Sequence, residues 1–236
     1  MRKVNAFTTM TVMMAAVISL ASPFSLGPTA ASGQTSSKIL LVPREGHSMD
    51  LDLAIKMEVG VMTKLLKNAG FEVDIATTSG QPISGPTQKI EKVSRLSEIN
   101  LDNYVGVIMP SMGVGAFPGP PVSPEAVAVV KKALTDGKPV AAAAHSSIIL
   151  AEAGLLQGKK YAYSSDPLKA LPWRTRTDPR FKEAIYSGTG VVQDGKIITS
   201  GACPTLEREY ASYPRLHVQD RTVELTQKFI AAIGPK

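Results

Sequence analysis

The sequence predicts a doubly wound α/β domain, in which helices cover both faces of a mostly parallel sheet. Short apolar segments alternate with amphipathic helical segments along most of the chain, and this alternation implies right-handed crossovers between parallel strands. About 200 of the 236 residues follow position 37, which suits one domain with a sizeable core. Cys203 is the only cysteine of the chain, so stability must come from that core and not from an internal disulfide.

The domain begins with a strand, a helix and a second strand. Residues 38–43 (KILLVP) form a short apolar run that indicates a buried strand. Asp50 and Asp52 open a helical segment that Gly70 closes, because glycine readily adopts the left-handed conformation that ends a helix. Residues 71–76 (FEVDIA) alternate as the next strand.

A loop leads to the next strand and helix. Residues 79–86 are rich in Gly, Pro and Ser, a composition typical of loops. Residues 104–110 (YVGVIMP) predict a third strand, and a helix runs from Ser123 to a turn at Gly137.

The second half repeats this alternation. Residues 139–144 (PVAAAA) predict a fourth strand, 147–155 a short helix and 159–163 (KKYAY) a fifth strand. Residues 190–201 are typical of a hairpin with an Asp-Gly turn. The segment 220–232 predicts a last helix.

The N-terminus has the layout of a secretory signal. Arg2 and Lys3 precede an uncharged apolar run at residues 10–21, and small residues follow up to Ala31. The run is shorter than the roughly 20 apolar residues of a membrane-spanning helix, although an uncleaved anchor stays an alternative. We expect an exported protein, periplasmic or secreted, with no stable membrane span once the signal is removed.

Three segments follow from this layout: a signal peptide at 1–31, a polar linker at 32–37 and one domain at 38–236. Subtracting Arg2 and Lys3 from the 26 basic residues leaves 24, against 20 acidic residues. These charges are scattered and aromatic residues are few, so the basic stripe with interleaved aromatics that nucleic-acid binding needs is absent.

The carboxyl ends of the strands are where a doubly wound sheet binds its ligands. One candidate side chain near these ends is Glu58, which shares a helical face with Ala54, Met62 and Leu66. Burial in this apolar stripe would raise the pKa of Glu58 and favour the protonated form. The alternative is that Glu58 lies at the edge of the stripe and its carboxylate reaches water.

The turn after residues 139–144 predicts a strand-to-helix elbow. Such an elbow exposes one side chain at the top of the sheet and aims backbone N–H groups at the same point. Covalent chemistry needs Ser, Cys or Asp there, but the sequence has Ala144. Ser146 or Ser147 is interpreted as the N-cap of the helix that follows.

The segments that carry these features resemble the ThiJ/PfpI superfamily, of the class I glutamine amidotransferase-like fold. The resemblance covers residues 38 to about 233, and its more specific stretches are ME…AGFEV and LAEAGLLQGKK. It implies a flavodoxin-like fold, often a homodimer, with an elbow cysteine and a buried glutamate in one pocket. Members of this superfamily are peptidases, cofactor-free glyoxalases or deglycases, isonitrile hydratases and chaperones.

By this resemblance, Glu58 matches the family glutamate and His145 matches the histidine that follows the nucleophile. Ala144 stands where the family has its cysteine. Ser111 and Met112 replace two family glycines after the third strand, so a side chain fills space that glycine leaves open. Asp166 stands where many members have histidine before proline.

Displaced chemistry is possible at two places. Cys203 would border the same pocket and act as a nucleophile if Glu58 or His145 lay near it and its pKa were lowered; the alternative is a small buried hydrophobe. His145 with Asp166 would suit acid–base chemistry, whereas Asp166 before proline is also typical of a turn.

A metal or cofactor is not expected. His47, Glu58 and His145 could supply a ligand set, but no close ligand spacing supports it. The Gly-x-Gly of residues 113–121 lacks the third glycine and the immediate helix of a dinucleotide loop.

These observations favour a binding protein without the usual nucleophile. It would hold a small anionic or carbonyl ligand in the former active-site pocket, where the expected contacts are Ala144, His145, Ser146, Ser111 and Met112. One alternative is a hydratase-, glyoxalase- or peptidase-like enzyme that uses Glu58 with His145, Asp166 or Cys203. Another is a dimeric chaperone-like or interaction protein.

Overall fold

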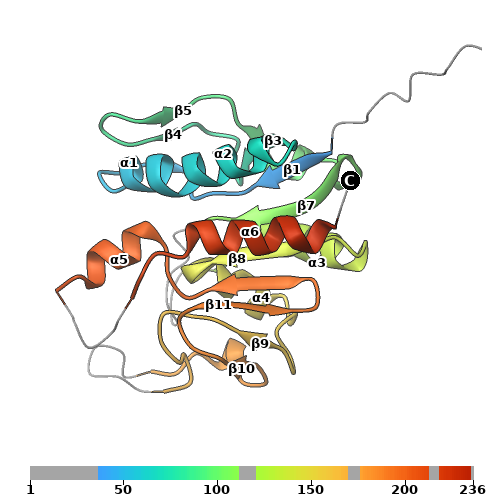
Figure 1. Cartoon of the computed structure of the whole chain (residues 1–236), viewed down its shortest axis with the longest axis vertical. Helices are drawn as coiled ribbons and strands as arrows, with labels where there is room; N and C mark the ends of the chain where they lie inside the picture. Colours follow the sequence, from blue (N-terminus) through green and yellow to red (C-terminus); the bar gives the residue numbers. More distant parts are fainter. Residues whose placement is uncertain (1–36, 112–120, 170–175, 213–217, 235–236) are drawn as a thin grey trace, which may run out of the picture. The chain divides into compact units, whose positions relative to one another are not determined.

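A computed structural model describes most of the chain from residue 37 onward, over residues 37–111, 121–169, 176–212 and 218–234 (Figure 1). The expected signal peptide at 1–31 and all but the last residue of the expected linker lie outside the described residues, as do Met112 and most of 113–121. No helix in the described ranges has the length and apolar character to cross a membrane.

The fold is built on a seven-stranded sheet with the order β11-β12-β8-β7-β1-β3-β6. Neighbouring strands are parallel, except that β11 runs antiparallel to β12. The mostly parallel sheet confirms the predicted α/β class. The strands are β1 (Lys38–Leu41), β3 (Glu72–Thr77), β6 (Ser94–Arg95), β7 (Tyr104–Met109), β8 (Val140–Ala143), β11 (Val191–Asp194) and β12 (Ile197–Ser200).

Helices cover both faces of this sheet. The α-helices are α1 (Leu51–Leu53), α2 (Gly60–Asn68), α3 (Pro124–Thr135), α4 (Ser147–Glu152), α5 (Pro204–Tyr210) and α6 (Thr222–Ile233). A π-helix, η1 (Ala54–Val59), joins α1 to α2. Short 3-10 helices are η2 (Leu96–Glu98), η3 (Leu101–Asn103), η4 (Ala144–Ser146) and η5 (Pro179–Phe181).

Two separate cores result because successive strand residues face opposite sides of the sheet. Leu40 belongs to the core with α3 and α4, whereas its neighbours Ile39 and Leu41 belong to the core with α2 and α6. Figure 1 shows α2 and α6 lying along the same side of the strands. Gly106 in β7 permits the close approach of α6, because a Cβ there would lie 2.6 Å from the Phe229 ring.

The first predicted helix is interrupted in its middle by a π-helix. The N–H of Gly60 donates to the carbonyl of Ile55, five residues earlier. The predicted end is confirmed, since Gly70 has a φ of 84° and the N–H of Phe71 reaches back to Leu66 O at 3.0 Å. Hydrophobic spacing does not reveal a single inserted residue, so the interruption escaped prediction.

The predicted fifth strand forms but does not join the seven-stranded sheet. It is β9 (Lys160–Tyr161), which pairs with β10 (Ile185–Tyr186) in a sheet of its own. The place next to β8 is taken by β12, the second strand of the correctly predicted hairpin. A further small sheet of β2 (Gly46–His47), β4 (Ile83–Ser84) and β5 (Lys89–Ile90) lies partly in the predicted loop 79–86.

Candidate functional site

The elbow after β8 has the predicted backbone form. Ala144 has a φ of 49°, the only positive φ of a non-glycine residue in the described part of the chain. An L-residue in this conformation costs roughly 1–2 kcal/mol, and such strain usually marks a functional turn. The methyl group of Ala144 is chemically inert, so the strained backbone presents no reactive group. The fold therefore keeps the strained elbow at a position that has no nucleophile.

The elbow is closed by the segment around α5. Ala144 is fully buried and clusters with Cys203 and Leu206, against which Tyr210 and Val218 also pack. A ligand would touch Ala144 only if this cover moved. Ser146 is fully buried as well. A ligand could therefore contact Ser146, like Ala144, only after a movement of the residues that cover it.

Ser146 occupies the N-cap position of α4, as predicted, but its side chain caps nothing. Its hydroxyl donates to Pro110 O at 2.7 Å, which ties the elbow to the end of β7. The hydroxyl of Ser147 is buried without a hydrogen-bond partner among the described residues. The predicted N-cap position is therefore confirmed, but the hydroxyl of Ser146 bonds the carbonyl of Pro110 and not an N–H of α4.

Glu58 is buried completely, which is one of the two alternatives that the apolar stripe left open. Its Oε1 accepts a hydrogen bond from the N–H of Ser111 at 2.8 Å, while Oε2 has no partner among the described residues. Burial, assisted by the charge of Asp220, raises the pKa of Glu58 to about 8, although the Ser111 hydrogen bond opposes the shift. The alternative of a solvated carboxylate is wrong.

The π-helix η1 places Glu58 in this position. Ile55, Glu58 and Val59 are its buried residues, so the wider turn brings the carboxyl group inward with its apolar neighbours. Single π-turns of this kind often occur at functional sites. Gly60 at the end of η1 suits the turn, since a Cβ there would lie 3.0 Å from Ile55 O.

Cys203 lies beside both Glu58 and the elbow. It is fully buried and packs in the cluster of Ala144. Burial, followed by the negative charge of Glu58, raises the pKa of the thiol to about 12. The thiol is thus protonated near neutral pH, the opposite of what an activated nucleophile needs.

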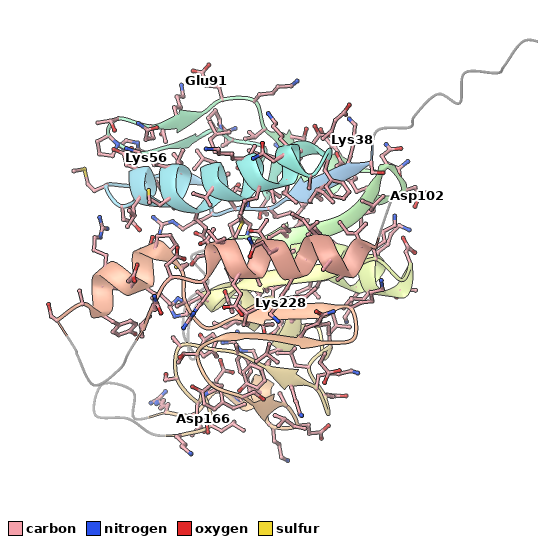
Figure 2. The ribbon with its side chains drawn as sticks, in the orientation of Figure 1. Lys38, Lys56, Glu91, Asp102, Asp166 and Lys228 are labelled. Carbon is pink, nitrogen blue, oxygen red and sulfur yellow. The ribbon has the colours of Figure 1, made fainter. Side chains whose placement is uncertain are left out.

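The contacts of His145 and Asp166 involve the segment from Tyr163 to Lys169. The His145 ring is half-buried, with its centroid 5.8 Å from that of Tyr163. Asp166 accepts from the N–H of Leu168 at 3.0 Å and lies 3.6 Å from Lys169 Nζ, as the turn interpretation predicts. Figure 2 shows Asp166 on the side of β9 and β10, away from α1 and α2.

The described residues show no group of three or more side chains suited to a metal ion. His47, which the sequence offered as a ligand, is exposed in β2 with its Nδ1 3.0 Å from Ser84 Oγ. Glu58 is instead buried against Ser111.

A small pocket lies beside Glu58. Its empty volume is about 220 Å³, which includes open solvent. Ala144 is not among its lining residues, which are Pro43, Arg44, Leu51, Ala54, Ile55, Glu58, Val59, Ile83, Pro110 and Ser111. The structure thus brings Glu58 and Ser111 together at a small pocket.

Arg44 and Asp220 are functional candidates that sequence reasoning missed. Arg44 directly follows Pro43 at the end of the first predicted strand, so the rule on carboxyl ends pointed to its segment without singling it out. Asp220 precedes the last helix, where it accepts from the N–H of Thr222 at 3.0 Å. Nothing in the sequence indicates that its charge acts on Glu58.

Comparison with known proteins agrees with this architecture. A protein from Brachyspira murdochii, described as a ThiJ/PfpI domain protein, superposes with a TM-score of 0.57 at 17% identity, over 84% of this chain and 96% of that one. A cysteine-to-alanine mutant of a DJ-1 superfamily protein from Salmonella typhimurium superposes with a TM-score of 0.52 at 20% identity, over 82% and 97% of the two chains. At these identities the likeness establishes the fold.

Two curated relatives are similar in sequence. An uncharacterised protein from Methanocaldococcus jannaschii is 28% identical over 70% of this chain and 75% of its own length. Deglycase PfpI from Pyrococcus furiosus is 35% identical over 40% of this chain and 57% of its own length. The sequence profile of the DJ-1/PfpI family matches residues 51–211, a span that includes Glu58, the elbow and Cys203. The chain belongs to the DJ-1/PfpI family.

Proposed function

We propose that this protein binds a small molecule in the pocket beside Glu58 and carries out no covalent chemistry at its elbow. The observation that carries the proposal is Ala144, which keeps the strained elbow backbone but offers only a methyl group, packed under Cys203 and Leu206. The carboxyl group of Glu58 is buried and lines a small pocket. Export through residues 1–31 and assembly as a homodimer belong to the same proposal, on the strength of the sequence alone.

A second candidate is an enzyme that uses Glu58 in acid–base catalysis. Relatives from Pyrococcus furiosus and Thermococcus kodakarensis are described as deglycases. A carboxyl group with a pKa near 8 is matched to proton transfer at neutral pH, which can contribute about a hundred- to ten-thousand-fold in rate. Cys203 is the weaker participant, because its pKa of about 12 leaves little thiolate.

Activity assays separate the two candidates. The purified chain, tested for glyoxalase, deglycase and peptidase turnover, should show none above a heat-denatured sample, because loss of a nucleophile lowers rates by several powers of ten. Ala144→Cys tests whether a thiol at the elbow restores turnover. Activity of the natural chain that is lost in Glu58→Gln or Cys203→Ser, but kept in the exposed control Glu98→Gln, would establish an enzyme instead.

A further inference from the structure

We infer that α5 is a cover that opens when Glu58 ionises, so that proton release by Glu58 gives solutes access to the elbow at Ala144. The inference goes beyond the proposed function, because it concerns the closed elbow and not the pocket beside Glu58. Three observations support it. The contacts that hold α5 are largely apolar, the carboxyl group next to it is buried with one hydrogen bond from the described residues, and the arginine that lines the same pocket is already paired with an aspartate.

Largely apolar contacts hold α5 (Pro204–Tyr210) against the rest of the domain. Leu206 and the preceding Cys203 are buried in the cluster of Ala144, and Tyr210 packs against the same cluster. The helix also packs on η1, which carries Glu58. Its charged side chains are exposed and form no ion pair with other described residues: Glu207, Arg208 and Glu209. Opening of α5 therefore breaks none of the ion pairs of the described chain.

The carboxyl group of Glu58 suits this closed arrangement only while it is protonated. Glu58 is fully buried, its Oε1 accepts a hydrogen bond from the N–H of Ser111 at 2.8 Å, and Oε2 has no partner among the described residues. A neutral acid tolerates such a site, whereas a buried carboxylate needs a cation or several donors. Ionisation of Glu58 therefore favours a rearrangement that lets water reach this group.

The charged groups around Glu58 do not neutralise a carboxylate there. Arg44 lines the same pocket, but its Nη1 and Nη2 donate to the two carboxylate oxygens of Asp50 at 2.9 and 2.7 Å. Asp220, which precedes α6, is acidic, and its charge acts on Glu58. Cys203 at the start of α5 carries a neutral thiol, because burial raises its pKa to about 12. Ionised Glu58 would therefore be repelled by Asp220, while Arg44 stays bound to Asp50.

The other charged side chains near η1 are exposed or bonded elsewhere. Asp52 of α1 accepts from the N–H of Thr87 at 3.0 Å and from the N–H of Gln88 at 2.7 Å. The half-buried His145 ring of η4 lies beside Tyr163. The lysines of η1 and α2 are exposed: Lys56, Lys64 and Lys67. Because Asp52 ties α1, which continues into η1, to the loop at residues 87–88, α5 is the side of the carboxyl group that moves.

The opening equilibrium should depend on pH in a defined direction. The pKa of Glu58 is about 8 in the closed form and returns towards its usual 4.5 once the group reaches water. Opening therefore releases a proton between these two pH values. The open fraction should rise by up to about ten-fold per pH unit from roughly pH 5 to 8 and level off above. The cover is thus closed most completely in acid.

Alkylation of Cys203, the only cysteine of the chain, measures the open fraction. The iodoacetamide rate of the urea-unfolded chain divided by that of the folded chain gives a protection factor, in which the titration of an exposed thiol cancels. This factor should fall at least about twenty-fold from pH 6 to pH 8. In Glu58→Gln, which cannot ionise, it should change by less than about three-fold.

The matched control is Glu98→Gln, whose side chain is 72% exposed, and it should follow the unmodified chain. If Glu58→Gln does not fold, the unmodified chain still decides the question. A protection factor of Cys203 that does not change from pH 6 to pH 8 would overturn the inference.

Global unfolding has to be separated from the opening of α5, because both expose Cys203. Hydrogen exchange of the β7 amides reports global unfolding, and their protection should exceed that of Cys203 by at least about ten-fold at each pH. Gly106→Ala, which adds a Cβ against Phe229 of α6, should lower the β7 protection and leave that of Cys203 nearly unchanged. Equal protection of Cys203 and β7, or a parallel fall of both in Gly106→Ala, would show that α5 opens only when the whole domain unfolds, and would overturn the inference.

Discussion

Glu58, Ala144 and Cys203 show how neighbours decide what a residue does. Burial makes Glu58 a carboxylic acid near neutral pH, whereas an exposed glutamate would be a carboxylate. The same burial makes Cys203 an inert thiol. Ala144 is a common residue in a rare conformation, and its backbone has the strained form in which such elbows present a reactive side chain.

The protonation of Glu58 should make the stability of the protein depend on pH. Its pKa is about 8 in the folded chain against 4.5 as the reference value. The unfolded chain therefore releases this proton first as pH rises, and the free energy of unfolding should fall between these two pH values, by up to about 5 kcal/mol. Urea unfolding at pH 5, 7 and 9 measures this fall.

The matched variants for that experiment are Glu58→Gln and the exposed Glu98→Gln. Glutamine at position 58 keeps the acceptor for the Ser111 N–H and cannot ionise, so it should remove most of the pH dependence and stabilise the chain at pH 9. Glu98→Gln should behave as the unmodified protein. Equal pH profiles for all three proteins would show that Glu58 ionises normally.

Cys203 should resist thiol reagents as long as the chain is folded. The thiol is fully buried and its pKa is about 12, so iodoacetamide at pH 7.5 should label it at least about a hundred-fold more slowly than in urea. Cys203 is the only cysteine of the chain, so mass spectrometry reads the reaction without ambiguity. Labelling at similar rates in both states would mean that the cover of the elbow opens readily.

At the scale of elements, three junctions build the site. The π-helix η1 brings Glu58 inward, the turn from β8 into η4 forms the elbow, and α5 with its preceding Cys203 closes that elbow. The alternation of strands and helices predicts the helix that carries Glu58 and the elbow after β8, but not the π-helical turn within that helix. The closure by α5 depends on a contact between residues about 60 positions apart, which local patterns do not contain.

The packing of α6 on β7 should depend on Gly106. A Cβ at this position would lie 2.6 Å from Phe229 Cζ and 3.1 Å from Pro139 O, so Gly106→Ala should lower the free energy of unfolding by about 1–3 kcal/mol. Phe229→Leu removes the ring that this Cβ would meet, so Gly106→Ala should lower the free energy of unfolding less in the Phe229→Leu background than in the unmodified protein. Urea denaturation of the four proteins in this double-mutant cycle measures the coupling, and additive effects would place the clash elsewhere.

For the whole molecule, the order of strands in the sheet predicts which backbone amides are protected from hydrogen exchange. β1, β7 and β8 lie in the middle of the sheet between two cores, and β6 and β11 lie at its edges. Local opening is easiest where few buried contacts hold the backbone. Hydrogen exchange followed by mass spectrometry should therefore show β1 and β7 protected longest and β6 first to exchange. Similar exchange in β1 and β6 would contradict this order.

The class of fold and the elbow follow from the amino-acid sequence alone, which left open whether Glu58 is buried or reaches water. Periodic apolar segments report which side of a strand or helix faces the core, and Glu58 could be placed within such a stripe. The resemblance of residues 38 to about 233 then led to the DJ-1/PfpI family, which the match to residues 51–211 bears out.

Four features became visible only in the folded chain: the pairing of the fifth strand, the π-helix, the cover over Ala144 and the small pocket beside Arg44. Each of these depends on contacts between segments distant in sequence or on one inserted residue. Spacing along the chain records neither kind of feature, because it reports how a residue faces the core and not which residue it meets there.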